Sequence, residues 1–313
     1  MELSLSAEEI MKLPLDNHLS ADPESRARML ALRQQQRFQT VQDLLYGYAL
    51  SRLVAAQIPL AKPNKHGVPI VTFDNRVQNS LLALLSPGVR SIVTEHCRIV
   101  IDGTPPGQSL PLDLPLRVSK CQLLNVYATA LKLGFFLRAV DARMRMDLQL
   151  DTVPETPAPA AKSPATAFLD KIVELSRLSA TAGPAAAFST YLDCVSANIL
   201  TAILLQMPAE CAQVMQRHAC ALFAVNDVTK LQAQFDKAVG VTEFTGLASA
   251  SEVTSLAKTI REGVQSGNLE SVTTSIGTMH RLVVEAVTLG SLLRDATQWI
   301  SARFPLLLRV AAG

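Results

Sequence analysis

Aromatic side chains and charge are both scarce in this chain. Of its 313 residues only 5% are aromatic, with a single tryptophan, and only 18% are charged. Hydrophobic residues nevertheless make up 49%, so the apolar content is mostly aliphatic. A chain with this balance can bury packed cores and does not have the composition of a disordered protein. Its Ala, Leu and Val content favours helices that pack closely on helices.

The sequence also lacks a disulfide framework and a targeting segment. Its five cysteines are odd in number and widely spaced, with no Cys-x-x-Cys pair. The first residues carry acids where a secretory signal or a transit peptide has basic residues. The longest apolar runs, such as 197–207, are shorter than the ~18 residues that span a bilayer. We therefore expect an intracellular, cytoplasmic protein with no signal peptide, no transmembrane segment and no membrane insertion.

Signatures of the common enzyme classes are absent as well. The sequence contains no Gly-x-x-x-x-Gly-Lys-Ser/Thr, no Gly-x-Gly-x-x-Gly after a strand, no Gly-x-Ser-x-Gly and no His-Glu-x-x-His. The five histidines are scattered, so the fold alone would have to assemble any pair of acid and base from them. We therefore predict no catalytic residue and no cofactor. An enzyme remains an alternative only if its site lies between two lobes and has no linear motif.

One group of soft side chains raises the question of a metal site. Cys211, Met215 and His218 are spaced i, i+4 and i+7, which places them on one face of a helix. Such side chains bind copper or zinc, but cysteine and methionine are also ordinary core residues. No pair of ligands has a standard metal-binding spacing, so we predict no metal and leave open whether these three residues are only core.

Composition divides the chain into three parts. Residues 151–165 hold four prolines and no large aliphatic residue after Val153, which is typical of an extended linker. We therefore expect an N-terminal lobe over residues 1–150 and a C-terminal domain over residues 166–313. The first is modestly basic, with 17 Lys and Arg against 13 Asp and Glu, whereas the second has 12 against 14.

The hydrophobic pattern predicts a mainly α protein with two different domains. In the N-terminal lobe we expect helices at about 23–56, 74–85 and 119–140. Strands are expected in the same lobe at 68–73, 91–102 and 143–150. This lobe is therefore predicted to be α+β with a small sheet. After the linker, Gly, Pro and Asn breaks delimit helical patterns only, so the C-terminal domain is predicted to be an all-helical bundle.

Arginines of the N-terminal lobe are candidates for nucleic-acid binding. Twelve of the nineteen arginines lie in this lobe, and arginine suits bidentate recognition of phosphate. One set lies on the helix that begins near residue 22, next to three glutamines, and the other lies on or just before the strand expected at 143–150. If the two sets converge, they line a groove for a single RNA strand. The candidate residues are Arg26, Arg28, Arg33, Arg37, Arg138, Arg143 and Arg145. The alternative is a solubilising surface in which these arginines pair with acids such as Glu24 and Asp43.

The C-terminal domain suggests self-association. Its helices are rich in Ala, Ser and Thr and poor in charge, so their apolar faces exceed what one bundle needs to bury. The alternative is a deep core within one large bundle. The residues proposed for an association face are Leu289, Leu292, Leu293, Phe304, Leu306, Leu307 and Leu308.

These observations lead to three hypotheses of different classes. The leading one is a non-enzymatic, self-associating structural or assembly protein, such as a coat, nucleocapsid or scaffold subunit, that forms homo-oligomers and binds other proteins. The second is a single-stranded RNA-binding protein that uses the arginines of the N-terminal lobe. The third is an enzyme with a site between the lobes.

Overall fold

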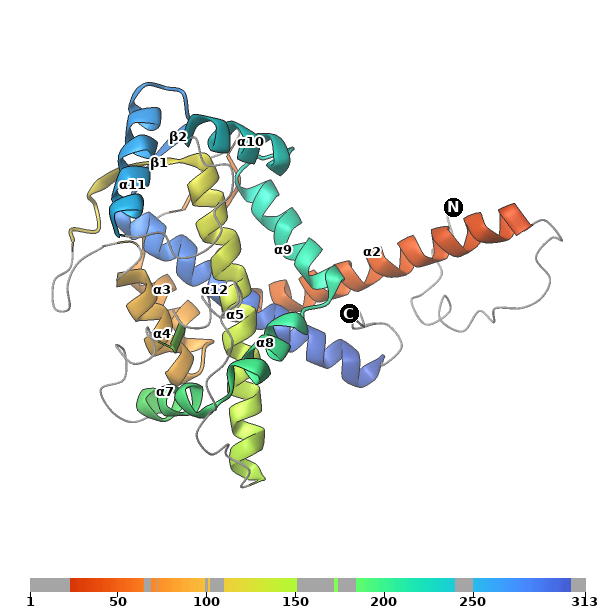
Figure 1. Cartoon of the computed structure of the whole chain (residues 1–313). Coiled ribbons are helices and arrows are strands. Elements are labelled where there is room, and N and C mark those ends of the chain that lie inside the picture. Colours follow the sequence, from red (N-terminus) through yellow and green to blue (C-terminus); the bar gives the residue numbers. More distant parts are fainter. Residues whose placement is uncertain are drawn as a thin grey trace.

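The computed structural model is mainly helical. It describes residues 23–64, 69–71, 73–98, 101, 110–150, 172–173, 184–239 and 250–304. Within these residues ten helices pack together, and a single two-stranded antiparallel sheet lies at one end (Figure 1). The mainly α class predicted from the composition is therefore confirmed.

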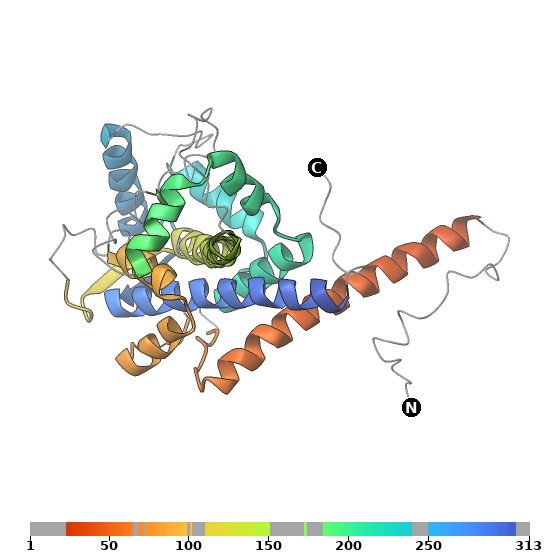
Figure 2. The ribbon, with the colours of Figure 1, turned by 90° about the horizontal axis from the view of Figure 1, so that it is seen from below.

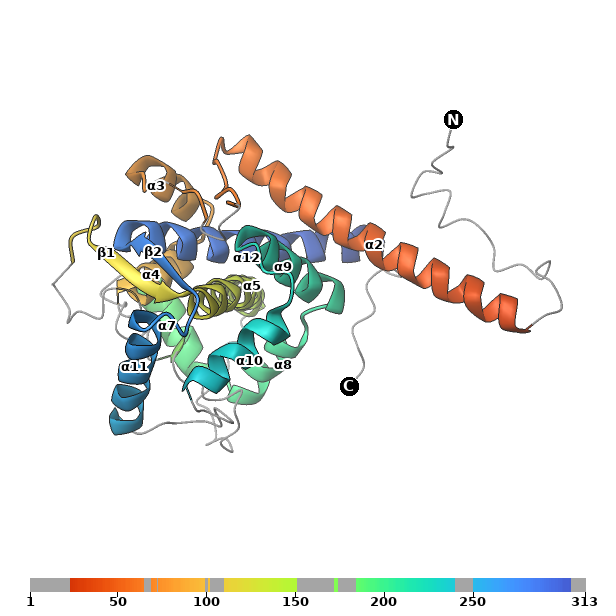
Figure 3. The same cartoon turned by 90° about the horizontal axis from the view of Figure 1, so that it is seen from above.

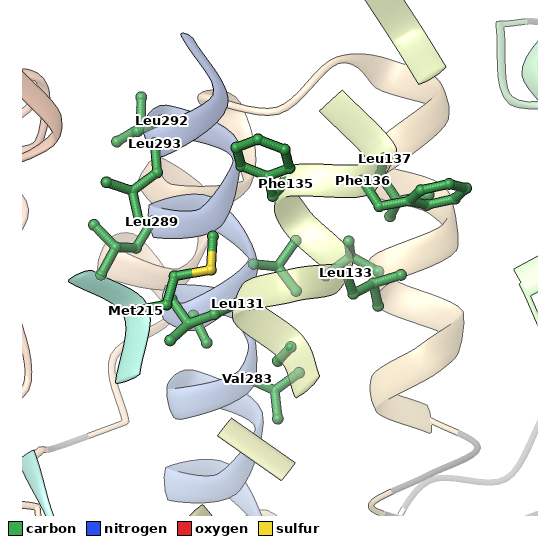
Figure 4. Packing of buried hydrophobic residues seen from close by; sticks show 14 of the residues in the cluster. Leu131, Leu133, Phe135, Phe136, Leu137, Met215, Val283, Leu289, Leu292 and Leu293 are labelled. Carbon is green, nitrogen blue, oxygen red and sulfur yellow. The ribbon is translucent and has the colours of Figure 1, made fainter. Parts of the chain in front are cut away.

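Two long helices form the centre of the fold. Helix α5 (Lys120–Gln149) and helix α12 (Ile276–Arg303) cross in close contact, and their buried side chains interleave in one core (Figure 4). Glycines permit this approach: a Cβ atom on Gly134 would lie 2.0 Å from the carbonyl oxygen of Val287, and one on Gly290 would lie 2.0 Å from that of Leu131. Real Cβ atoms essentially never lie within 3.0 Å of a heavy atom from another part of the chain, so both positions require glycine at this helix spacing.

The other helices are arranged around this central pair. Helix α2 (Pro23–Ala55) crosses α12, while α3 (Asn75–Ala83) and α4 (Pro87–Cys97) also lie against α12. Figure 2 shows α2 and α12 side by side, with α5 seen nearly along its axis. The remaining helices are α7 (Pro184–Cys194), α8 (Ala197–Leu205), α9 (Ala209–Leu222), α10 (Val228–Val239) and α11 (Ala250–Gln265).

The sheet joins the two halves of the chain. Strand β1 (Pro115–Ser119) pairs antiparallel with β2 (Ser271–Ser275), and each strand leads directly into a central helix, α5 or α12. Lys120 strengthens the junction: its backbone N–H donates to the carbonyl of Glu270 at 2.8 Å and its Nζ to the carboxylate of Glu270 at 2.9 Å. The sheet therefore fixes the starts of both central helices at the same end of the fold.

Local signals in the sequence set several helix ends. Pro23 occupies the first position of α2, where the missing N–H costs nothing, and α2 continues without a break to Ala55. Asp74 caps α3, since its carboxylate accepts a hydrogen bond from the backbone N–H of Arg76 at 2.7 Å. The helices predicted at 23–56 and 74–85 are therefore confirmed. The one predicted at 119–140 is also present but extends to Gln149.

Two of the three predicted strands are wrong. The segment predicted as a strand at 91–102 lies largely in α4, which begins with Pro87 at its first position, and residues 143–150 form the last turns of α5. In the third segment, 68–73, the described residues include only an isolated bridge between Ile70 and Lys62. The prediction of an all-helical C-terminal half is wrong as well, because β2 lies within it.

A division into two domains is not shown. One cluster of buried apolar residues includes side chains from α2, α4 and α5 together with others from α7, α9 and α12. The central helix pair itself joins the first half of the chain to the second. The proposed linker at 151–165 lies outside the described residues.

Candidate nucleic-acid interface

The first half of α2 stands away from the other described helices. Figures 1 and 3 show it as an arm that extends beyond the other helices. Among its described side chains from Ala27 to Gln36, all are exposed except that of Met29, which is half-buried. Residues 23–38, called the arm below, span about 24 Å at the rise of an α-helix. They hold four arginines and one glutamate, so the arm carries a net charge of +3.

The predicted arginines of this arm have different surroundings. Arg28 pairs with Glu24 one turn earlier, as the alternative of a solubilising surface predicts. Arg33 is exposed and Arg37 is half-buried, and within the described part of the chain neither forms an ion pair. One Nη atom of Arg37 is buried without a hydrogen-bond partner. The side chain of Arg26 lies outside the described residues.

The unpaired arginines share one stripe of α2 with residues nearer the core. Arg33, Arg37, Leu44 and Tyr48 are separated by four, seven and four residues. These intervals are close to whole numbers of helical turns, so the four positions follow one another along the same side of the helix. We call them the arginine stripe. It leads from the exposed arm to the point where α2 meets α12.

The arginines of the second set are paired with acids. Arg138 binds Asp295 of α12 at 2.7 Å and Asp141 at 3.2 Å. Arg145 also binds Asp141, at 2.8 Å, and Arg143 binds Asp147 at 2.8 Å. Three carboxylates thus neutralise these three guanidinium groups.

The two predicted arginine sets do not converge. The second set lies on the last turns of α5, which are helical and not the strand that the alternation predicted. This end of α5 and the arm of α2 point away from the centre of the fold in different directions (Figures 1 and 3). The groove expected between the two sets is therefore not formed, and of these two sets only the arm has described arginines without an acidic partner.

An aromatic cluster lies where α2 meets the end of α12. The ring centroids of Tyr48 and Trp299 are 5.7 Å apart, and those of Trp299 and Phe304 are 6.3 Å apart. The guanidinium of Arg303 lies 4.6 Å from the centre of the Trp299 ring, within the range of a cation–π contact. All three rings are half-buried and Arg303 is exposed. No sequence pattern indicated this cluster, because Tyr48 is far from the other two rings along the chain.

The apolar residues predicted for self-association are mainly core residues. Leu289, Leu292 and Leu293 are at most 4% exposed and belong to the common core, where Figure 4 shows them on the side of α12 that faces Met215 of α9. The prediction that these three leucines form an association face is therefore wrong, because the fold already covers them. Phe304 is half-buried in the aromatic cluster. Leu306, Leu307 and Leu308 lie outside the described residues.

The candidate soft ligands lie inside the fold. Cys211 and Met215 are buried in the common core, and burial raises the pKa of the Cys211 thiol to about 12. His218 lies between two tyrosines: its Nδ1 is 3.0 Å from the hydroxyl of Tyr46, and its Nε2 is 2.9 Å from that of Tyr127. Burial lowers the pKa of His218 to about 4, so the imidazole is neutral and exchanges hydrogen bonds with both hydroxyls. Among the described residues, no three His, Cys, Asp or Glu side chains are grouped as metal ligands.

A buried ion pair lies near this histidine. Arg281 and Glu285 are 1% and 0% exposed, and Nη1 of Arg281 is 2.7 Å from a carboxylate oxygen of Glu285. The backbone N–H of Ala61 donates to Glu285, and Nη2 of Arg281 donates to the carbonyl of Pro59 at 2.7 Å. Burial raises the pKa of Glu285, an effect that Arg281 opposes. This pair fixes the segment after α2 against α12.

Among the described helices, two have the length and hydropathy of membrane spans. They are α5 and α12, and a third span is counted if the bent pair formed by α7 and α8 is taken as one segment. The most apolar windows of α5 and α12 are 67% and 89% buried inside the fold. The sequence shows no unbroken apolar run of this length, but an 18-residue window in each of these helices is apolar on average.

Comparisons with known proteins give a family match over one part of the chain. Residues 70–150 match a family described as a protein of unknown function, DUF760. A UV-B-induced, chloroplastic protein of Arabidopsis thaliana is 25% identical over 302 residues, which cover 90% of this chain and 64% of that protein. The chain thus spans less than two thirds of the length of this relative. No solved structure matches.

Proposed function

We propose that this chain is a non-enzymatic binding protein that holds single-stranded RNA on the arm of α2. The observation that supports this most directly is the arm itself: a positively charged helix with unpaired arginines that extends beyond the packed helices of the fold. A short helix without tertiary packing is only marginally stable in water, because helices gain most of their stability from packing. A partner that covers the arm would supply that packing.

Charge favours a polyanion over a second arm as this partner. Two arms of net charge +3 repel each other when they lie side by side, whereas a phosphate backbone attracts both Arg33 and Arg37. Arginine also donates two parallel hydrogen bonds to one phosphate. Gln34, Gln35 and Gln36, which are exposed beside these arginines, add donors and acceptors for sugars and bases.

Salt dependence of RNA binding tests this proposal. We would measure the affinity of the full chain for a fluorescently labelled oligouridine by anisotropy over a series of salt concentrations. The double variant Arg33→Ala with Arg37→Ala should bind more weakly, and its plot of log affinity against log salt should flatten by about 0.7 for each phosphate that an arginine no longer neutralises. Both changes lie on exposed or half-buried helical positions, and alanine favours the helix.

A matched control uses arginines that already have acidic partners. The double variant Arg143→Ala with Arg145→Ala removes the same charge from the end of α5, where Asp147 and Asp141 neutralise it. We expect its RNA affinity and salt slope to stay close to those of the unchanged protein. Equal effects of the two double variants would mean that net charge alone drives binding, and no effect of Arg33→Ala with Arg37→Ala would refute a site on the arm.

A second candidate, self-association, is supported by a different surface. At the free end of α5, Met146, Leu148 and Leu150 are 52%, 55% and 68% exposed, which is unusual for three large apolar residues so close together. We propose this end of α5 as the contact between copies, in place of the buried leucines of α12. Light scattering should show an oligomer that the Leu148→Glu, Leu150→Glu double variant dissociates, and a monomer at high concentration would refute this contact.

We also propose that the protein is intracellular and does not insert into a membrane. The apolar side chains of α12 are engaged in the core, which supports a fold that buries them without lipid. All five cysteines are free, as a reducing compartment favours. The relative from Arabidopsis thaliana is named chloroplastic, so the cytoplasm is only one of the intracellular compartments to test.

A further inference from the structure

The aromatic cluster beside the arm has the chemistry of a base-stacking surface. Proteins that bind single strands combine a basic path for the phosphates with aromatic rings on which bases stack. The arginine stripe supplies the first part, and the rings of Tyr48, Trp299 and Phe304 supply the second. Tyr48 belongs to both, because it lies on the same side of α2 as Arg33 and Arg37 and contacts Trp299.

We propose that bases of the bound RNA stack on the Tyr48, Trp299 and Phe304 cluster while its phosphates follow Arg33 and Arg37. This inference rests on the function proposed for the arm and extends it to the junction of α2 and α12. From Arg33 to Tyr48 the helix rises about 22 Å, enough for several nucleotides of a single strand. At this junction the rings of Tyr48 of α2 and Trp299 of α12 are 5.7 Å apart.

Arg303 explains how a base gains access to the ring of Trp299. Its guanidinium lies over this ring in the free protein, and it is exposed. A base on an aromatic face interacts more strongly than an exposed guanidinium does, so a base displaces Arg303. The displaced side chain then points its charge toward the phosphates of the same strand. The site is thus occupied by a weak internal contact that RNA replaces.

The single tryptophan makes stacking directly observable. Because Trp299 is the only tryptophan of the chain, its fluorescence reports on this cluster alone. Titration of the full protein with oligoadenylate, whose bases stack well, should quench this fluorescence. Titration with inorganic polyphosphate, a polyanion without bases, should leave it unquenched although polyphosphate binds to the arm. Equal quenching by oligoadenylate and polyphosphate would overturn the stacking inference, since such quenching would reflect only the movement of Arg303.

Substitutions of Tyr48 give a second readout that does not depend on fluorescence. Tyr48→Leu should lower the affinity for oligoadenylate roughly tenfold and leave that for polyphosphate unchanged. Tyr48→Phe keeps the ring and should bind like the unchanged protein, which separates an effect on stacking from an effect on folding. If Tyr48→Leu is too unstable to purify, the fluorescence comparison still decides.

The two proposals fail in different ways. If oligoadenylate binds and binding depends on Arg33 and Arg37, but fluorescence is unquenched and Tyr48→Leu is without effect, the stacking inference is overturned and the arm remains an RNA site. If quenching occurs and Tyr48→Leu weakens binding while the arginine variant does not, the cluster binds bases and the proposed role of the arm is refuted. If neither RNA nor polyphosphate binds, both proposals are overturned.

Discussion

Replacing Gly134 with alanine should separate the two central helices of the fold. A Cβ atom at this position would lie 2.0 Å from the carbonyl oxygen of Val287 and within 3 Å of two more backbone atoms of that residue. Because the obstacle is the backbone of α12, no side chain can rotate to make room. The helices must move apart by about 1 Å to restore a normal contact, and this loosens the most extensive helix–helix contact among the described elements.

The expected change in stability combines two opposing effects. Overpacking a closely packed core costs about 1 to 3 kcal/mol, and a backbone obstacle places this variant near the upper value. Alanine in a helix raises the free energy of unfolding by about 1 kcal/mol relative to glycine. We therefore expect Gly134→Ala to lower the free energy of unfolding by about 2 kcal/mol.

A second glycine supplies the matched control. Gly47 lies in the middle of α2, and a Cβ atom there would have no heavy atom within 4 Å. Gly47→Ala gains helix propensity without a clash, so it should raise stability by up to about 1 kcal/mol. The two variants should thus differ by about 3 kcal/mol in urea unfolding followed by circular dichroism. If Gly134→Ala is as stable as Gly47→Ala, the close crossing of α5 and α12 is refuted.

Buried and capping groups lead to three further predictions. His218 has a pKa of about 4 in the fold and about 6.5 when unfolded, so the unfolded chain binds more protons between these pH values. The free energy of unfolding should therefore fall by up to about 3 kcal/mol from pH 6.5 to pH 4. Urea titrations at each pH should show a smaller fall for His218→Gln. Glu285→Leu leaves Arg281 charged and unpaired in the core and should cost about 3 to 5 kcal/mol, most of which the additional change Arg281→Met should restore in the same assay. Asp74→Ala removes the cap of α3 and should cost about 1 kcal/mol in thermal unfolding, whereas Asp74→Asn should be nearly neutral.

The sequence predicted those helices whose ends carry strong local signals. Pro23 and Asp74 mark the starts of α2 and α3 through the chemistry of the first helical turn, which depends only on neighbouring residues. The same type of signal was present at Pro87, where α4 begins. The β-branched residues after Pro87 favour a strand and led to the wrong prediction for this segment. In the structure, burial against α12 overrides their strand preference.

The error at 143–150 has an identifiable cause. Polar and apolar residues alternate strictly in this segment, but its arginines also have acids four residues away. Asp141 with Arg145 and Arg143 with Asp147 both form ion pairs across one helical turn. The spacing of the charged residues therefore indicates the helix that is observed, whereas the hydrophobic alternation indicates a strand.

The site was predictable only where it lies within one element. The spacing of Arg33 and Arg37 indicates a common helical side whatever the tertiary structure is. The aromatic cluster, in contrast, requires Tyr48 of α2 to meet Trp299 of α12, and no local pattern indicates such a contact. In the same way, β1 and β2 pair across about half of the chain, so neither strand could be predicted from a neighbouring partner.

The central helix pair has a consequence for synthesis of the protein. The apolar face of α5 is complete once residue 149 has been made, but the helix that covers it, α12, begins only at Ile276. At translation rates of about 5 to 20 residues per second, α5 waits roughly 6 to 25 s for its partner. During that interval a nascent chain exposes Leu131, Phe135 and their neighbours to other chains and to chaperones. The order of the helices along the chain thus leaves an apolar face of α5 without its main cover until α12 emerges.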